Sequence, residues 1–245
     1  MHFLLVQAFI FGDESFMELK TNNDELIHHV MSSVGGFLGA YALLNRHENY
    51  GSSATSNMII IISDILGHSF KESFIRIIAL LIYVFSIVLF VTIKNKTSVN
   101  VRKLSIFLDG CCLVALAFLP ADMDYIMSLY PIFFVTAFQW SSFINAGRFS
   151  SSTIFSTNNL RMAVSGFTSY CINKDESQLE QAKFFGLTLL YYHIGVIYSY
   201  ISYKLFGIQG SFMGFLPLFA AFFIMAFQEY SVKKESNAAV ENSTI

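Results

Sequence analysis

About six runs of roughly 20 predominantly apolar residues follow one another along this chain, and that length matches the hydrocarbon core of a lipid bilayer. Only 13% of the 245 residues are charged, whereas about a quarter are charged in an ordinary soluble domain. One soluble core cannot enclose so many apolar runs. The sequence therefore predicts an all-α, polytopic membrane protein with about six transmembrane helices.

The apolar runs define a single transmembrane domain over residues 26–228. Its predicted spans are Leu26–Leu44, Phe74–Ile93, Leu104–Leu119, Tyr125–Ile144, Phe184–Tyr203 and Ile208–Phe227. Residues 1–25 begin with an apolar stretch that lacks basic residues and runs into Asp13 and Glu14, which argues against a signal peptide. We expect this segment to lie on the membrane surface, and residues 229–245 to form a polar cytoplasmic tail.

Two further segments are too short to span a bilayer. Ser52–Leu66 and Ser152–Tyr170 are each apolar at one end and rich in Ser, Thr and Asn at the other. Such a pattern predicts two re-entrant half-helices. Non-helical backbone is tolerated at membrane depth only inside protein or beside a cavity, so we expect these segments to be enclosed by the spans.

Basic residues predict the orientation, because cytoplasmic loops are enriched in Lys and Arg. The loop Lys94–Lys103 carries four of them and is assigned to the cytoplasm. The loop holding Asp122 and Asp124 then lies outside, and both termini lie inside. This topology places eleven of the 15 basic residues inside.

The order span, half-helix, span, span occurs twice, over residues 26–119 and 125–227. Three spans per copy is an odd number, so the second copy is inverted relative to the first. Ala54–Asn57 then corresponds to Ser156–Asn159, and Gly36-Phe37 to Ala137-Phe138.

Short motifs recur at matching places in the two copies. Gly36–Ala40 reads GFLGA and is followed by Thr55–Asn57, which reads TSN; Ala137–Ser141 reads AFQWS and is followed by Thr157–Leu160, which reads TNNL. An acidic residue, Asp109, lies early in the third span. In order and spacing these elements resemble the YoaK-type family of bacterial multi-pass inner-membrane proteins, whose function is unassigned. The resemblance covers nearly the whole chain and implies a bacterial inner-membrane location.

The chain departs from the family pattern at four positions. Gly39 stands in place of the usual Asp, Trp140 in place of Asn, and Ser56 and Asn158 in place of the glycines of the two TGN elements. Asn158 can adopt a left-handed backbone more readily than Ser56. The pattern is that of a divergent member.

The polar ends of the half-helices are the predicted substrate site. Discontinuous helices that meet near mid-membrane direct free N–H groups and a positive dipole end at a ligand in many transporters. The candidates are Thr55, Ser56, Asn57, Thr157, Asn158 and Asn159, with Gln139 as a further polar candidate. The alternative is that these residues cap the short helices, or in the case of Gln139 bridge spans, without binding a solute.

Asp109 and His193 are the predicted proton-coupling residues, since ionisable groups inside a membrane are costly and usually face a bundle interior or a cavity. The alternative is a structural hydrogen bond between helices for either residue, or extension of Asp109 to the interface. Gly35, Gly36 and Gly39 form a small-residue face suited to close helix packing.

No motif for catalysis, phosphate or nucleotide binding appears, so we expect neither an enzyme nor a cofactor. The adjacent His28 and His29 have no third ligand near in sequence, and we expect them at the membrane interface and not at a metal. A net charge of −2 argues against a nucleic-acid partner.

The architecture favours a small-solute transporter or permease with a central site between the half-helices. The alternative is a non-transporting scaffold or partner-stabilising protein, which needs no central cavity. The expected partners are the lipid bilayer and a small solute, and a homo-oligomer stays among the alternatives.

Overall fold

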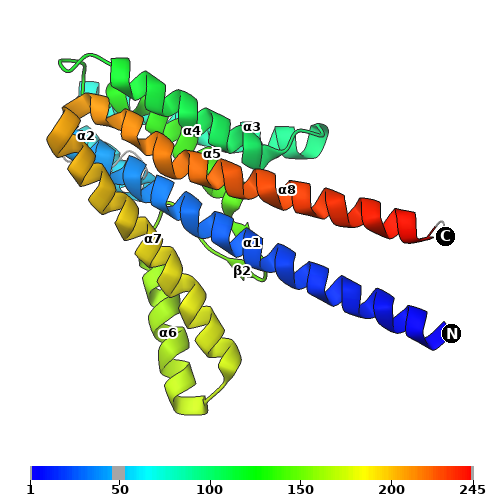
Figure 1. The fold of residues 1–245 in the computed structure, drawn as a ribbon. Coiled ribbons are helices and arrows are strands. Elements are labelled where there is room, and N and C mark those ends of the chain that lie inside the picture. Colours follow the sequence, from blue (N-terminus) through cyan, green and yellow to red (C-terminus); the bar gives the residue numbers. More distant parts are fainter. Residues whose placement is uncertain (1, 46–52, 244–245) are drawn as a thin grey trace.

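The computed structural model describes residues 2–45 and 53–243, with side chains described for residues 23–45, 53–231 and 234. Almost all of this chain is helical (Figure 1). The helices are α1 (His2–Asn45), α2 (Ala54–Leu66), α3 (Phe70–Lys96), α4 (Val101–Phe118), α5 (Tyr130–Phe143), α6 (Thr157–Asn173), α7 (Glu176–Phe206) and α8 (Phe215–Ser243), with short 3-10 helices η1 (Met127–Leu129) and η2 (Gly207–Gly214). The strands β1 (Asn145–Ala146) and β2 (Phe149–Ser150) pair as a small antiparallel hairpin. The predicted all-α class is confirmed.

Each predicted span and half-helix overlaps a helix, although residues 152–156 at the start of the second half-helix are not helical. The first, second and third spans lie in α1, α3 and α4, and the last three in α5, α7 and α8, while the predicted half-helices overlap α2 and α6. In the described residues, three segments are long and apolar enough to cross a membrane: Asn23–Asn45, Phe70–Lys96 and Glu176–Ser231, the last covering α7, η2 and α8. α4 has 18 residues and α5 has 14. The full set of six spans therefore stays a prediction.

α1 is the core of the bundle. It packs against α7 along most of its length and also contacts α8, α5 and η2. Its side chains from Ile27 to Ala42 are buried, in keeping with its position between these neighbours. Phe37 and Leu38 join Phe133 from α5 and Leu113 from α4 in one apolar core. A helix that is buried all round needs apolar or small residues on every face. This explains why the apolar residues of α1 are not confined to one stripe.

Glycine allows α1 and α7 to approach backbone to backbone. A Cβ atom on Gly36 would lie 2.0 Å from the carbonyl oxygen of Tyr192, and one on Gly195 would lie 2.0 Å from the carbonyl oxygen of Ser33. No side chain fits at either position. The small-residue face predicted on the first span therefore serves packing at Gly36.

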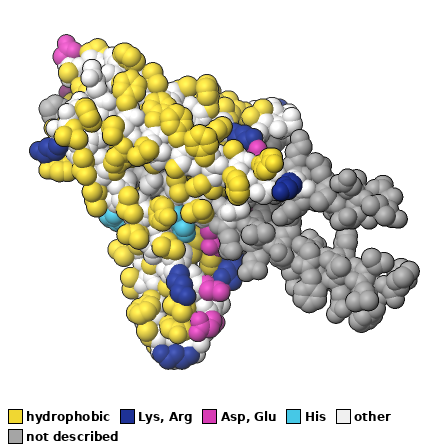
Figure 2. Space-filling view, viewed as in Figure 1, with side chains coloured by type: hydrophobic (Ala, Val, Ile, Leu, Met, Phe, Trp, Pro, Cys, Tyr) yellow, Lys and Arg dark blue, Asp and Glu magenta, His cyan; other side chains and the backbone are white. Residues whose placement is uncertain are grey.

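The outside of the bundle is apolar. Large hydrophobic side chains are exposed along α3, α7 and α8, and Figure 2 shows them spread over most of the described surface. Examples are Leu81 and Phe85 on α3, Ile197 on α7, and Phe223 and Phe227 on α8. Soluble monomers rarely expose such large contiguous apolar surface, so the helices are compatible with a lipid environment.

Two ion pairs connect the start of α4 to α1 and α8 at one end of the bundle. Arg102 at the start of α4 contacts Asp24 of α1 at 2.8 Å, and Lys103 contacts Glu229 of α8 at 2.5 Å. Arg102 also donates to the carbonyl oxygen of Asn145 after α5. All of these residues belong to segments that the predicted topology places on the cytoplasmic side.

Both ends of the chain extend from this end of the bundle (Figure 1). Residues 2–22 continue α1 without a break, and residues 232–243 continue α8. The structure therefore does not separate residues 2–25 or 229–243 as independent elements. That the first of these segments lies on a membrane surface stays a prediction.

Candidate functional site

A buried, non-helical segment lies beside the apolar part of α1, Asn23–Asn45, near the middle of that part. Residues 151–156 connect β2 to α6 in irregular conformation, and Ser151, Ser152, Thr153 and Ile154 are all buried. The segment comes so close to α1 that a Cβ atom on Gly35 would lie 2.1 Å from the carbonyl oxygen of Thr153. Irregular backbone at this depth must be enclosed by protein or line a cavity, and here α1 covers it. We call residues 151–156 the buried loop.

Gln139 of α5 links the buried loop to α1. Its Nε2 donates to the carbonyl oxygen of Met31 at 2.9 Å and to Oγ1 of Thr153 at 3.0 Å. The side chain is entirely buried, and its Oε1 has no hydrogen-bond partner among the described residues. An unsatisfied buried acceptor is uncommon in native proteins, so this oxygen marks a polar position able to bind a donor.

Asn159 fixes the other end of the buried loop. Its Nδ2 donates to the carbonyl oxygens of Ser152 at 2.8 Å and Phe155 at 3.1 Å, and its Oδ1 accepts from Oγ of Ser151 at 2.8 Å. Oγ of Ser152 accepts from the N–H groups of Ile154 and Phe155, which closes a local turn. The structure therefore places two predicted site residues, Gln139 and Asn159, at the same buried segment.

Asn57 occupies the corresponding place in the first half of the chain. It is buried, its Nδ2 donates to the carbonyl oxygen of Ser53 at 2.8 Å, and its Oδ1 accepts from Nη1 of Arg76 at 3.1 Å. Arg76 also lies 3.4 Å from a carboxylate oxygen of Asp64. These contacts fasten α2 to α3. The Asn57–Arg76 contact was not predicted from the sequence, although Arg76 inside an apolar run was a signal that pointed to a buried partner.

The remaining half-helix candidates are not brought into a common site. The side chains of Thr55, Thr157 and Asn158 are exposed, and Ser56 is half-buried and bonds back to Ser53. Moreover, α2 packs on α3 and α6 packs on α7, and α2 and α6 do not form a packed pair in the described part of the chain.

The predicted meeting of the two half-helix ends is therefore wrong. Each half-helix folds back on the helix that follows it. For α2 the cause is the buried Arg76 contact, and for α6 it is a tight turn in which Lys174 has a left-handed φ of 58°.

His28 and His29 are both buried among the helices of the bundle. Nδ1 of His28 donates to the carbonyl oxygen of Phe143 at 2.8 Å, which leaves Nε2 of the neutral ring as an acceptor without a partner among the described residues. The Thr188 hydroxyl donates to the carbonyl oxygen of Phe184, so it accepts from Nδ1 of His29 at 3.2 Å. The sequence missed this placement, because a histidine pair beside an apolar run is equally typical of a membrane boundary.

Asp109 and His193 do not share a cavity. Asp109 is entirely buried on α4, and neither carboxylate oxygen has a hydrogen-bond partner in the described residues. His193 is exposed on α7, and its Nδ1 bonds to the carbonyl oxygen of Leu189 in its own helix. α4 and α7 do not pack against each other. The predicted relay between these two residues is therefore not present, and Asp109 is a buried acidic residue without a hydrogen-bond partner in the described part of the chain.

No cluster of three or more His, Cys, Asp or Glu side chains suited to a metal occurs in the described residues. In the described residues, the polar side chains at the buried loop are amides and hydroxyls, which can orient a small polar solute by hydrogen bonds.

These features define a class: an all-α bundle with apolar outer helices and a buried polar loop beside its core helix. Within that class, a family model described as a protein of unknown function, DUF1275, matches residues 27–227. The chain belongs to this family, to which the YoaK-type proteins also belong, so the resemblance seen in the sequence is confirmed. No curated protein and no solved structure matches the chain.

Proposed function

We propose that the protein is a bacterial inner-membrane transporter or permease for a small polar solute, and that the solute binds at the buried loop. The observation that carries the proposal is an irregular polar segment beside the middle of the apolar part of α1, Asn23–Asn45. It lies next to Oε1 of Gln139, which has no hydrogen-bond partner among the described residues. Many secondary transporters bind substrate where a helix is interrupted at mid-membrane. The proposed site is smaller than the one predicted from the sequence between the two half-helices. Its polar groups come from Gln139, Thr153 and Asn159.

The packing of the helices supports two inverted repeats, in which α1 to α4 correspond to α5 to α8. The α1–α7 contact corresponds to the α5–α3 contact, the α1–α8 contact to the α5–α4 contact, and the α2–α3 pair to the α6–α7 pair. The asparagines agree as well, since Asn57 and Asn159 each bond to the carbonyl oxygen four residues earlier. Alternating access in such proteins is a rocking of one repeat against the other.

One observation favours the alternative, a non-transporting scaffold. α1 and α7 touch through backbone atoms at Gly36 and Gly195, which is the dense packing of a fixed core. A transporter needs the buried loop to become accessible to water in at least one conformation, whereas a scaffold does not.

Cysteine labelling separates the two functions without knowledge of the solute. In a variant lacking the three native cysteines, Ser152→Cys should react with a charged, water-soluble thiol reagent, although Ser152 is only 8% exposed. Ala221→Cys is the matched control, because the side chain of Ala221 on α8 is entirely buried. It should stay unlabelled whether the protein is a transporter or a scaffold. Equal and negligible labelling at the two positions would favour the scaffold.

The same cysteine-free protein tests the topology. Asp122→Cys, in an exposed loop, should react with an impermeant thiol reagent added outside intact cells. Lys96→Cys should react only after the cells are opened, because the positive-inside rule assigns the loop that follows α3 to the cytoplasm. The reverse result at both positions would overturn the orientation, and labelling of both positions from the same side would overturn the inverted relation of the repeats.

A further inference from the structure

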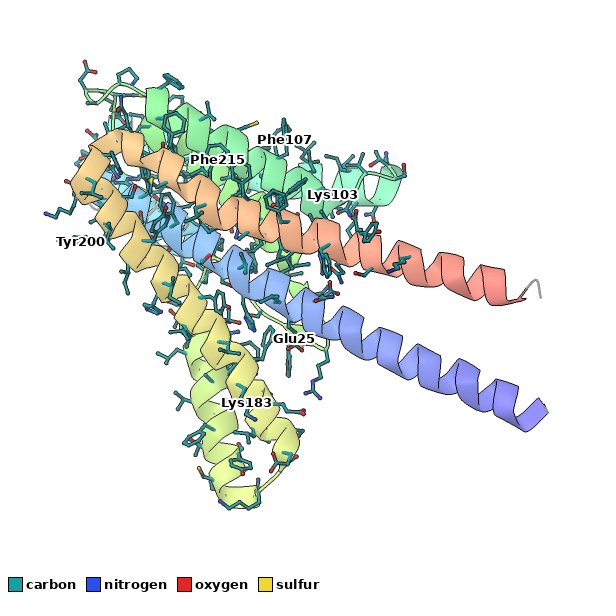
Figure 3. All side chains as sticks on the ribbon, in the orientation of Figure 1. Glu25, Lys103, Phe107, Lys183, Tyr200 and Phe215 are labelled. Atoms are coloured by element: carbon teal, nitrogen blue, oxygen red, sulfur yellow. The ribbon has the colours of Figure 1, made fainter. Side chains whose placement is uncertain are left out.

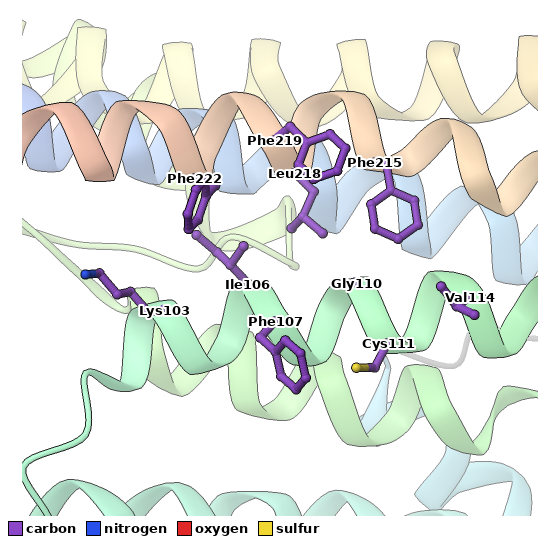
Figure 4. Close-up of a pocket in the computed structure, with 10 residues that line it drawn as sticks. All are labelled: Lys103, Ile106, Phe107, Gly110, Cys111, Val114, Phe215, Leu218, Phe219 and Phe222. Carbon is purple, nitrogen blue, oxygen red and sulfur yellow. The ribbon is translucent and has the colours of Figure 1, made fainter.

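α4 and α8 leave an apolar groove between them on the outside of the bundle (Figure 4). It has a volume of about 510 Å³ and lies away from the buried loop. Along it lie Lys103, Phe107, Gly110 and Val114 of α4 and Phe215 and Phe222 of α8. Gly110 forms part of its floor, since a Cβ atom there would contact the ring of Phe215 at 3.4 Å.

The groove has the length of one leaflet. Its outermost residues along α4, Lys103 and Val114, are eleven positions apart, which corresponds to about 16 Å of helix. Half of a bilayer's hydrocarbon core is about 15 Å thick. An acyl chain that starts at Lys103 therefore ends near Val114.

The polar end of the groove carries both signs of charge. Nζ of Lys103 lies 2.5 Å from a carboxylate oxygen of Glu229, and both side chains are nearly half exposed. Lys103 has three N–H donors, so it can bind a phosphate oxygen while it stays close to Glu229. Glu229 in turn can accept from an ammonium group. A cation and an anion side by side match a headgroup that itself holds a phosphate and a primary ammonium.

We propose that this groove is a specific site for one acyl chain of phosphatidylethanolamine, with the phosphate on Lys103 and the ammonium on Glu229. The proposal requires that the protein lies in a membrane, and it is independent of transport at the buried loop. Phosphatidylglycerol has no ammonium for Glu229, and the quaternary ammonium of phosphatidylcholine has no N–H to donate. Both should bind less well.

Native mass spectrometry of the delipidated full-length protein tests the site, with the three lipids added at equal concentration and with identical acyl chains. We expect phosphatidylethanolamine to bind about fivefold more tightly than the other two, and Glu229→Gln to remove that preference, because only Glu229 distinguishes the headgroups. Lys103→Gln should instead weaken the binding of all three lipids, since each of them carries the phosphate. The matched control is Lys183→Gln, because Lys183 lines a different apolar groove, between α6 and α7, well away from Lys103 (Figure 3). That control should leave the binding of all three lipids unchanged.

A second pair of variants tests the apolar part of the site. Gly110→Leu should fill the groove and abolish the tight binding, whereas Gly186→Leu, at a helix position with nothing within 4 Å, should not. Equal binding of all three lipids to the native protein would overturn the headgroup assignment. A dimer that Gly110→Leu dissociates, with no lipid preference in the native protein, would show that a second copy of the chain occupies the groove.

Discussion

Gly36→Ala should be among the most destabilising single substitutions in this protein, lowering its free energy of unfolding by about 3 kcal/mol. The added methyl group would lie 2.0 Å from the carbonyl oxygen of Tyr192, and a backbone atom cannot rotate away as a side chain can. α1 and α7 would have to separate along their contact. Gly195→Ala, which meets the carbonyl oxygen of Ser33 at 2.0 Å, should have a similar effect from the opposite side of the contact.

The chain provides a matched control and a probe for this experiment. Gly186 is also within α7 but has nothing within 4 Å of the added Cβ, so Gly186→Ala should be stabilising by about 0.5–1 kcal/mol through helix propensity alone. Trp140 is the single tryptophan and packs edge-on against Phe155 of the buried loop, with the ring centroids 5.2 Å apart. Its fluorescence should therefore report unfolding. If Gly36→Ala and Gly186→Ala behaved alike, close packing of α1 and α7 would not be what stabilises the bundle.

The helices could be predicted from the sequence because their signal is local. Runs of apolar residues locate α3, α7 and α8, and clusters of Ser, Thr and Asn locate the starts of α2 and α6. The sequence predicts Gln139, Asn57 and Asn159 as substrate-binding residues, with helix capping or, for Gln139, bridging between spans as the alternative. In the structure all three side chains are buried and hydrogen-bonded to the loop, the backbone or Arg76.

Contacts between distant segments could not be predicted in this way. The meeting of the half-helices was inferred from their polarity, but polarity at a helix start is satisfied equally well by local capping, as at Ser53 and Ser56. The pairing of Asp109 with His193 was inferred from depth alone. Depth leaves the rotation of each helix undetermined, and a rotation of half a turn moves a side chain from the interior to the surface, as His193 shows.

Asp109→Leu should raise the stability of the protein. The carboxyl group of Asp109 is entirely buried, and neither oxygen has a hydrogen-bond partner among the described residues. Burial of a polar group without a partner costs about 1–3 kcal/mol, and an apolar side chain of similar size removes that cost. The substitution should therefore increase the free energy of unfolding by an amount in this range, measured by denaturation of the purified protein in detergent.

A buried polar residue with a partner on the neighbouring element is the control for Asp109. Ser211 of η2 is equally buried, but its hydroxyl donates to the carbonyl oxygen of Leu113 of α4 at 2.9 Å. Ser211→Ala should therefore lower the stability by about 1 kcal/mol, opposite in sign to Asp109→Leu. A lower stability of the Asp109→Leu protein would instead indicate a structural partner for the carboxylate. A gain would mean that Asp109 makes the native fold less stable than it could be, which is the expected signature of an intramembrane residue kept for function, because native proteins tolerate such a cost chiefly at functional sites.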